Sequence, residues 1–158
     1  MTDLRIRPLD PNDAAALIGR ADAHMSALYP PESNHFESIQ ALQLPNVLFI
    51  GAFADDVLVG CGAVKTLCDD GIYGEIKRVF VLEEQRGKGI STALMRVLEA
   101  HLAAAGVPCA RLETGIRQAA AIALYRRLGY AERGPYGSYV RDPLSLFMEK
   151  PIPSQGRR

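Results

Sequence analysis

Residues 79–91 read VFVLEEQRGKGIS and carry more structural information than any other part of the chain. An apolar run comes first, which is typical of a buried strand, and a turn with two glycines follows it. From Ile90 on, apolar residues recur every three or four positions as far as Leu102, a pattern that predicts an amphipathic helix. The segment therefore predicts a strand, a glycine-rich turn and a helix in direct succession.

The turn has the properties of an anion site. The first N–H groups of a helix have no partner inside the helix, and the helix dipole places partial positive charge beside them. Gly87 and Gly89 allow the backbone to come close to a bound phosphate, and Arg86 and Lys88 add positive charge. We therefore expect a phosphate group to bind at this turn.

Two common phosphate motifs do not fit the turn. A Walker A loop needs the pattern GxxxxGK[ST], which the turn does not have. A dinucleotide-binding fingerprint needs GxGxxG, and Thr92 occupies the place of its third glycine. A dinucleotide-dependent redox enzyme stays an alternative, but it requires a parallel, doubly wound sheet, which the pattern of the preceding strands argues against.

The elements around the turn predict one mixed domain. Strand-like runs at residues 47–53, 57–67 and 73–82 are separated by short turns, which favours antiparallel pairing. The other elements that we expect are strands at residues 4–7, 110–114, 130–133 and 144–149 and helices at residues 14–28, 35–44, 90–102 and 119–128. We therefore predict an α/β domain of the α+β type over residues 1–150, with a mixed, mostly antiparallel sheet, and a polar tail at residues 151–158.

Composition narrows the classes of function. The 158 residues hold 18 basic and 18 acidic side chains, and a net charge of zero argues against a nucleic-acid-binding protein, which needs a basic excess. Cys61, Cys68 and Cys109 have no CxxC spacing and the three histidines form no ligand pattern, so we expect no metal site. No apolar stretch approaches the ~20 residues that span a membrane, and the first nine residues lack the apolar core of a signal peptide, which favours a cytoplasmic protein without a membrane partner.

The turn also matches a third phosphate pattern, Q/R-x-x-G-x-G/A. Residues 86–91 read RGKGIS, with Ser91 in place of the last Gly or Ala. Farther along, residues 121–130 read AIALYRRLGY, and Gln118 stands three residues before them. This stretch resembles the later helix of the GCN5-related N-acetyltransferases, the GNAT superfamily, which is often written N-x-x-A-I-x-L-Y-x-x-x-G-F. With both motifs present, the chain resembles a small bacterial GNAT protein.

The resemblance implies a sheet with a splayed strand pair, helices on both faces and acetyl-CoA as cosubstrate. Val79, Phe80 and Val81 would pair with the pantetheine arm, and the N–H of Val79 or Phe80 would face the thioester carbonyl. The amides of the turn would hold the pyrophosphate, and they belong to Arg86, Gly87, Lys88, Gly89, Ile90 and Ser91. Gln118 and Tyr125 of the second motif would complete the cofactor site.

The implied reaction is the direct attack of an amine on the thioester in a ternary complex, and it needs two proton-handling groups. Tyr125 matches the family tyrosine near the CoA sulfur, so we expect it to be the general acid. The alternative for Tyr125 is a core tyrosine on an amphipathic helix.

Glu75 is the expected general base, because family members often use a glutamate from the strand before the turn. Strict alternation along this strand puts Glu75, Lys77 and Val79 on one face of the sheet. The alternative for Glu75 is a solvent-facing side chain paired with Lys77 or Arg78. Glu113 on the next strand is a weaker candidate for the base.

The expected acceptor is a primary amine of a small molecule, an amino acid or a peptide. The candidates for its pocket are Tyr29, Glu75, Tyr136, Tyr139, His24 and His35. A homodimer is compatible with the family. The alternative class is an acyl-CoA-binding sensor without turnover, which the departures at Ser91 and Gln118 keep open.

Overall fold

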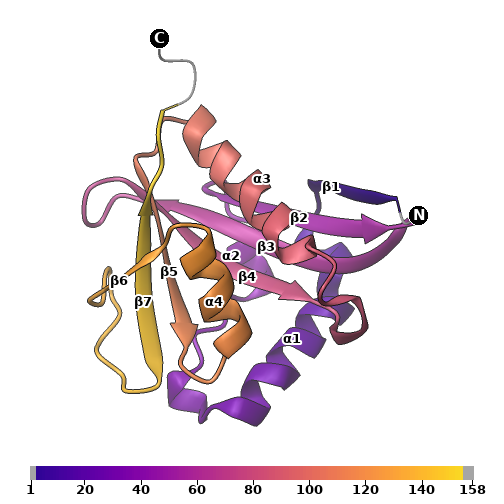
Figure 1. Cartoon of the computed structure of the whole chain (residues 1–158), viewed down its shortest axis with the longest axis horizontal. Helices are drawn as coiled ribbons and strands as arrows, with labels where there is room; N and C mark the ends of the chain where they lie inside the picture. Colours follow the sequence, from indigo (N-terminus) through magenta and orange to yellow (C-terminus); the bar gives the residue numbers. More distant parts are fainter. Residues whose placement is uncertain (1–2, 155–158) are drawn as a thin grey trace.

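The computed structural model describes residues 3–154, which form a seven-stranded sheet with helices on both faces (Figure 1). The strands are β1 (Leu4–Pro8), β2 (Val47–Ala54), β3 (Val57–Leu67), β4 (Tyr73–Val81), β5 (Cys109–Gly115), β6 (Ala131–Arg133) and β7 (Ser145–Pro151). The helices are α1 (Ala15–Leu28), α2 (Ile39–Leu42), α3 (Ile90–Ala104) and α4 (Ala119–Arg127). Short 3-10 turns are η1 (Pro11–Ala14), η2 (Pro31–Ser33) and η3 (Glu83–Gln85).

The strand order is β1-β2-β3-β4-β5-β7-β6, and each neighbouring pair except β4 and β5 is antiparallel. Strands β4 and β5 form the parallel pair, and α3 joins them. Parallel neighbours need such a crossover connection, because the chain must return to the same end of the sheet. The predicted fold class, a mixed and mostly antiparallel sheet, is confirmed.

Strands β4 and β5 pair over a short length and then part. Their register runs from Gly74 opposite Ala110 to Ile76 opposite Leu112, so the later residues of both strands have no partner across this gap. Figure 1 shows the two arrows starting side by side and diverging. The splayed strand pair implied by the family resemblance is therefore present.

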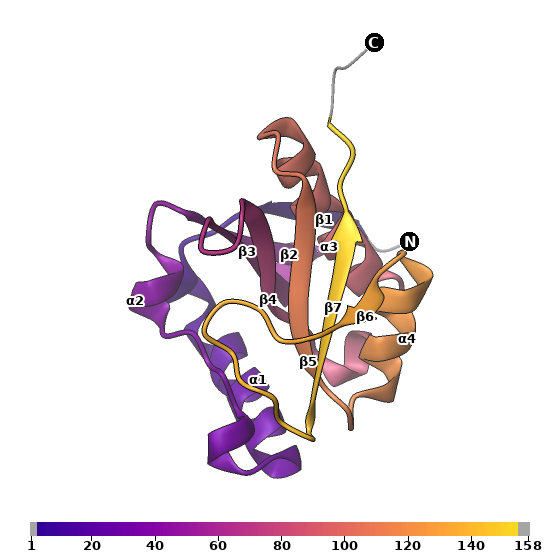
Figure 2. The ribbon, with the colours of Figure 1, turned by 90° about the vertical axis from the view of Figure 1, so that its left-hand side faces the viewer.

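Helices cover the two faces separately, with α1 and α2 on one side and α3 and α4 on the other (Figure 2). The apolar stripe of α3 is fully buried, with Leu94, Leu98 and Leu102 each 0% exposed. Each such leucine contributes about 1.5–3 kcal/mol of hydrophobic free energy. On the opposite face, Leu17 and Ile18 of α1 pack in a second cluster. The core thus fixes the sheet that carries the diverging strands.

A β-bulge interrupts β4 at Arg78, which has a φ of 60°. Between its pairings with Ala63 and Cys61, β4 has two residues where β3 has one, and the Cys61 thiol donates to the Arg78 carbonyl oxygen at 3.3 Å. The predicted alternation is therefore wrong beyond Lys77. Val79 packs in the cluster of the α3 face, away from the α1 face, because the extra residue reverses the pleat.

Two segments differ in extent from the expectation. The predicted helix at residues 35–44 is reduced to α2, which Ser38 begins by accepting a hydrogen bond from the Ala41 N–H at 3.1 Å. At the other end of the chain, β7 extends to Pro151, and Ile152 is buried and donates its N–H to the Pro108 carbonyl at 2.8 Å. The last four residues of the expected tail lie outside the described residues. Within residues 3–154, no helix has the length and apolar character to cross a membrane.

Candidate active site

A pocket of about 100 Å³ opens where β4 and β5 part. Strands β4 and β5 contribute most of its wall, and the segments before α2 and before β7 contribute the rest. It is lined by His35, Phe36, Glu75, Ile76, Lys77, Arg78, Glu113 and Tyr139. The shortened helix matters here, because residues 34–38 are irregular and bring His35 and Phe36 to the pocket.

Glu75 is the most firmly held carboxylate of the pocket. It is 4% exposed, and its Oε2 accepts hydrogen bonds from the hydroxyls of Tyr136 at 2.8 Å and Tyr139 at 2.6 Å. The Lys77 Nζ donates to the Tyr139 hydroxyl at 3.0 Å and lies 3.9 Å from Glu75 Oε2. Glu75, Tyr136 and Tyr139, all three expected at the acceptor side, are thus brought together.

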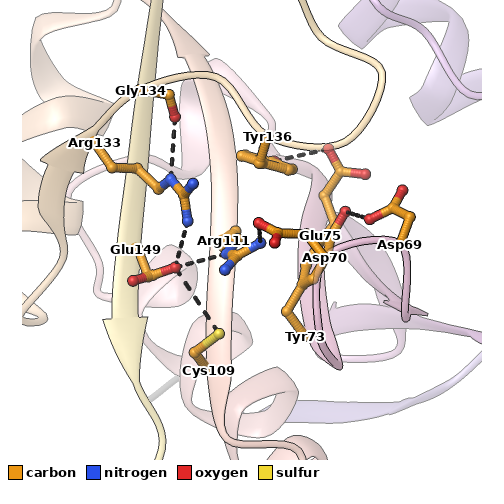
Figure 3. Close-up of polar contacts among 10 residues, drawn as sticks. All are labelled: Asp69, Asp70, Tyr73, Glu75, Cys109, Arg111, Arg133, Gly134, Tyr136 and Glu149. Carbon is orange, nitrogen blue, oxygen red and sulfur yellow. Dashed lines mark hydrogen bonds and ion pairs between the residues drawn. The ribbon is translucent and has the colours of Figure 1, made fainter.

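Tyr136 is itself held from behind by a polar cluster (Figure 3). Its ring packs edge-on against Tyr73 with centroids 5.5 Å apart, and the Arg111 guanidinium lies 4.4 Å from the Tyr73 ring centre. Arg111 is fixed in turn by Glu149, at 2.6 Å, and by Asp70, at 3.0 Å. This cluster keeps the Tyr136 hydroxyl on Glu75. Burial and the negative charge of Glu75 raise the pKa of Tyr136, so its hydroxyl remains a donor.

Glu113 is a second carboxyl in the same pocket, and it stands on the first residue of β5 beyond the pairing with β4. Ser145 on β7 donates its hydroxyl to Glu113 Oε2 at 2.8 Å. Burial raises the pKa of Glu113, and the bond from Ser145 opposes this rise. From the sequence Glu113 is the weaker candidate for the base, and this ranking stays a prediction. The signal that identifies it is its place on the strand beside β4.

Tyr125 lies on α4 within the core of the α3 face and is 8% exposed. Its ring meets the Tyr130 ring edge-on at a centroid distance of 5.9 Å. Burial raises the pKa of Tyr125 to about 12, and the nearby charge of Glu113 adds to the effect. Tyr125 therefore holds its proton at neutral pH, while it also packs as a core residue.

The glycine turn lies between η3 and α3 as expected. Gly87 and Gly89 both have a φ of +79°, and a Cβ built on either would meet no atom within 4 Å. Helix α3 then begins at Ile90 without a side-chain cap. Arg86 donates its Nε to the Val81 carbonyl at 3.1 Å, and Lys88 reaches Gln85 at 3.0 Å. The backbone is thus open toward solvent at the point where an anion was predicted.

Two of the predicted site residues, Gln118 and Tyr29, make hydrogen bonds outside the pocket. The side-chain oxygen of Gln118 accepts the Gly115 N–H at 3.1 Å and so closes the turn into α4. Tyr29 is 5% exposed, and its hydroxyl accepts the Arg117 N–H at 3.0 Å. The Tyr29 hydroxyl fills the space that a side chain at Gly115 would need. Tyr29 is not among the residues lining the pocket, and its predicted acceptor contact remains a prediction.

The described residues include no group of three or more His, Cys, Asp or Glu side chains that could hold a metal ion. The lining of the pocket offers two carboxyls, two cations, the His35 imidazole and the Tyr139 hydroxyl, beside the unpaired edges of two strands. Such a set can bind a charged amine and move protons.

Comparison with known proteins assigns the family. Residues 20–130 match the model of the acetyltransferase (GNAT) family, and the chain belongs to this family. It is 47% identical over 136 residues to the IAA acetyltransferase of Azospirillum brasilense, covering 86% of this chain and 88% of that one.

Solved structures agree with this assignment. A Klebsiella pneumoniae structure provisionally described as an acyl-CoA N-acyltransferase is 38% identical, with a TM-score of 0.80 and coverage of 94% of this chain and 97% of that chain. The PaiA N-acetyltransferase of Thermoplasma acidophilum, solved in complex with coenzyme A, shares the fold at 21% identity and a TM-score of 0.71, with coverage of 94% and 99%.

Proposed function

We propose that this protein is an acetyl-CoA-dependent N-acetyltransferase that moves the acetyl group to a primary amine within a ternary complex. One observation carries the proposal. Strands β4 and β5 part beside an open glycine turn, and a carboxyl from each strand lines the pocket between them. This arrangement offers a place for the thioester and for the amine that attacks it.

The turn fits the cosubstrate. The open backbone at Gly87 and Gly89 leaves room for a pyrophosphate, which the amides of residues 86–91 would hold. Strand β4 turns an unpaired edge toward β5 after Ile76, and residues 79–81 on it would bind the pantetheine arm. The N–H of Val79 or Phe80 would then stabilise the negative charge that develops on the thioester oxygen.

Glu75 and Glu113 have different roles toward the acceptor amine. Oε2 of Glu75 already accepts two tyrosine hydroxyls, so Glu75 serves best as a fixed anchor for the ammonium form of the acceptor. Glu113 accepts one hydroxyl, from Ser145, and its pKa is raised by burial, which suits a general base. We therefore assign the proton abstraction to Glu113, and this assignment revises the expectation for Glu75.

The reaction balances with these groups. The ammonium loses a proton to Glu113, and the neutral amine attacks the carbonyl carbon of the thioester. As the C–S bond breaks, Tyr125 gives its proton to the departing CoA thiolate, and the new amide releases its remaining excess proton to solvent. The high pKa of Tyr125 keeps it protonated until that step. Glu113 then loses its proton to solvent and the Tyr125 phenolate takes one up, so both groups return to their starting forms.

A thermal-shift titration tests the cosubstrate first. Acetyl-CoA or CoA at about 100 times its Kd should stabilise the protein by about 2.7 kcal/mol, which is roughly 5–10 °C in Tm for a domain of this size. NAD should give no shift. A thiol-release assay with a panel of amines then separates an enzyme from an acyl-CoA sensor, because a sensor binds acetyl-CoA without releasing CoA.

We also propose that the protein is cytoplasmic. Cys61, Cys68 and Cys109 are free thiols in the structure. Free thiols are in keeping with the reducing cytoplasm that we expect for the protein.

A further inference from the structure

Two of the residues that line the pocket, His35 and Phe36, belong to a segment without regular structure. Residues 34–38 form neither helix nor strand, and Phe36 is 41% exposed. Such a segment lacks the repeating backbone hydrogen bonds that fix a helix or a strand. Side chains from the neighbouring elements must therefore hold this segment at the pocket.

Arg78 holds the segment through its side chain. The Arg78 Nη2 donates to the Glu37 carbonyl oxygen at 2.6 Å, and the Nη1 pairs with Asp22 on α1. The guanidinium carbon also lies 5.3 Å from the centre of the Phe36 ring. A planar guanidinium holds two partners in fixed directions, so Arg78 joins β4, α1 and the segment in one arrangement. We call the bonds to Asp22 and Glu37 the Arg78 clamp.

Two lysines also reach the segment, but only through a side chain. The Nζ atoms of Lys65 and Lys77 lie 3.6 and 3.3 Å from Oε1 of Glu37. The Glu37 side chain can change rotamer without moving its backbone, so these ion pairs constrain the backbone less than a bond to the carbonyl oxygen does. The clamp therefore has the larger effect on where His35 and Phe36 lie.

The backbone conformation at Arg78 also favours a role for its side chain. A φ of 60° suits glycine, and it costs energy in a residue with a Cβ atom. The bulge itself is supported from β3, because the Cys61 thiol donates to the Arg78 carbonyl oxygen at 3.3 Å. The bulge therefore needs no arginine, and backbone strain at a residue that lines a pocket points to a function of that residue.

We propose that Arg78 is a positioning residue that holds residues 34–38 at the pocket, so that His35 and Phe36 contact the bound amine. The inference rests on the proposed function, because the pocket is the acceptor site of that reaction. Arg78 acts through the segment and needs no contact of its own with the amine. Loss of its side chain should therefore weaken acceptor binding and leave acetyl-CoA binding intact.

Steady-state kinetics test this difference between the two substrates. Arg78→Gly removes the clamp and keeps the bulge, because glycine adopts a φ of 60° without strain. The acceptor is the amine of the panel that gives the fastest CoA release with the unmodified protein. Its KM should rise at least about tenfold in Arg78→Gly, because a small misplacement of a site residue is costly. The KM for acetyl-CoA should stay the same.

Two further variants and a control assign the effect to the clamp. Arg78→Lys keeps the charge and the strained backbone, but an ammonium group cannot replace the guanidinium fork, so the amine KM should rise here too. Asp22→Ala removes one partner of the clamp, and the 36% exposure of the Asp22 side chain favours a folded variant with a raised amine KM. The control is Asp56→Gly: Asp56 has a φ of 67° and does not line the pocket, so both KM values should persist.

Proteolysis reports the position of the segment without turnover. Chymotrypsin cleaves after phenylalanine, and Phe36 lies exposed in the segment, whereas Phe49 on β2 is 4% exposed and reports unfolding of the core. The ratio of cleavage after Phe36 to cleavage after Phe49 should rise at least about tenfold in Arg78→Gly, because cleavage follows the population of the locally opened form. The masses of the fragments identify the two cuts.

The outcomes separate this inference from the proposed function. An unchanged amine KM in Arg78→Gly, or loss of its acetyl-CoA binding, would overturn the inference even if the unmodified protein transfers acetyl groups fast. If Arg78→Gly does not fold, an unchanged amine KM in both Arg78→Lys and Asp22→Ala would overturn it. If no amine gives CoA release, the acetyltransferase proposal fails and the cleavage ratio decides: a higher ratio supports the clamp, and an equal ratio overturns it.

Discussion

Glu113 stands one residue past the last pairing of β5 with β4, and Glu75 stands one residue before it on β4. The two carboxyls therefore enter one pocket from strands that are fixed to each other and then separate. Their surroundings differ, since two tyrosines hold Glu75 and one serine holds Glu113. Burial raises the pKa of Glu113, and a raised pKa suits a carboxyl that takes up a proton from the acceptor.

Glu113→Gln tests the assignment of the base. The variant keeps the size and part of the hydrogen bonding but cannot take a proton, so kcat should fall by about 10²–10⁴-fold while the KM for acetyl-CoA stays the same. Steady-state thiol release measures both constants. The control is Glu132→Gln, on an exposed residue of β6, which should leave kcat unchanged. A Glu113→Gln enzyme with normal kcat would exclude the assignment.

The pH profile of kcat/KM gives a second test of Glu113. A base must be ionised, so activity falls as the pH drops through its pKa, and burial moves that pKa above the ordinary 4.5. The positive charges of His35 and Lys77 oppose the rise, and Glu75 adds to it. Ser145→Ala removes a bond that lowers the pKa, so its acid limb should lie at higher pH than that of the unmodified protein. Identical acid limbs would contradict this account.

Tyr125→Phe tests the general acid. Loss of the hydroxyl should lower kcat by about 10²-fold or more with little change in acetyl-CoA affinity or Tm, because the ring keeps its packing. Tyr130→Phe is the matched control. Its hydroxyl donates to Glu99 at 2.8 Å, so this variant should lose about 1–2 kcal/mol of stability and keep its kcat. A Tyr125→Phe variant that loses stability and retains its kcat would make Tyr125 purely structural.

Gly89→Val tests the phosphate turn against a control with the same backbone conformation. Gly89 has a φ of +79° and Gly71, in the β3–β4 turn, has a φ of +64°, and a Cβ at either position would meet no atom within 4 Å. Valine at either site should cost about 1–2 kcal/mol of stability. Calorimetry should show loss of CoA binding in Gly89→Val alone. Equal CoA affinity in both variants would remove the turn from the cosubstrate site.

Glu149→Gln tests the cluster behind Tyr136. Burial alone would raise the pKa of Glu149, but the bonds from Arg111 and Arg133 outweigh it, so its pKa lies below the ordinary 4.5. The stability that these bonds contribute is therefore present above pH 4.5 and is lost as the pH falls through the lowered pKa.

At pH 7, Glu149→Gln should lower the free energy of unfolding by about 1–2 kcal/mol. This value allows for the partial exposure of the Glu149 side chain. In urea denaturation, the difference in free energy of unfolding between Glu149→Gln and the unmodified protein should shrink below pH 4.5. Glu84→Gln, which breaks an exposed pair with Arg20, should change stability by less than about 1 kcal/mol at any pH. A gap that does not depend on pH would show that the cluster acts through packing.

Local patterns predicted most of the fold, since the period of the apolar residues locates α3 and the strand-like apolar runs between short turns locate β2 and β3. The bulge at Arg78 was beyond such reasoning, because no glycine or proline marks it and the pairing with β3 imposes it. The place of Glu113 in the pocket could not be predicted for a related reason, because it depends on where β5 stops pairing with β4, which is a property of the sheet.

The acceptor side was predicted only in outline. Tyr136 and Tyr139 were expected at the pocket, yet their bonds to Glu75 span 61 and 64 residues, and no local pattern encodes contacts over such separations. The same holds for Arg78 and Asp22, which meet across α1 and β4. Strand and helix positions follow from short-range periodicity, whereas the site follows from long-range packing.

The most direct test of acetyl transfer is CoA release from acetyl-CoA with and without an amine, with the product identified by mass. The account predicts release that depends on the amine, an N-acetylated product in equal amount, and loss of both in Gly89→Val and Glu113→Gln. Tight acetyl-CoA binding with no amine-dependent release across the whole panel would contradict the account and leave an acyl-CoA sensor in its place.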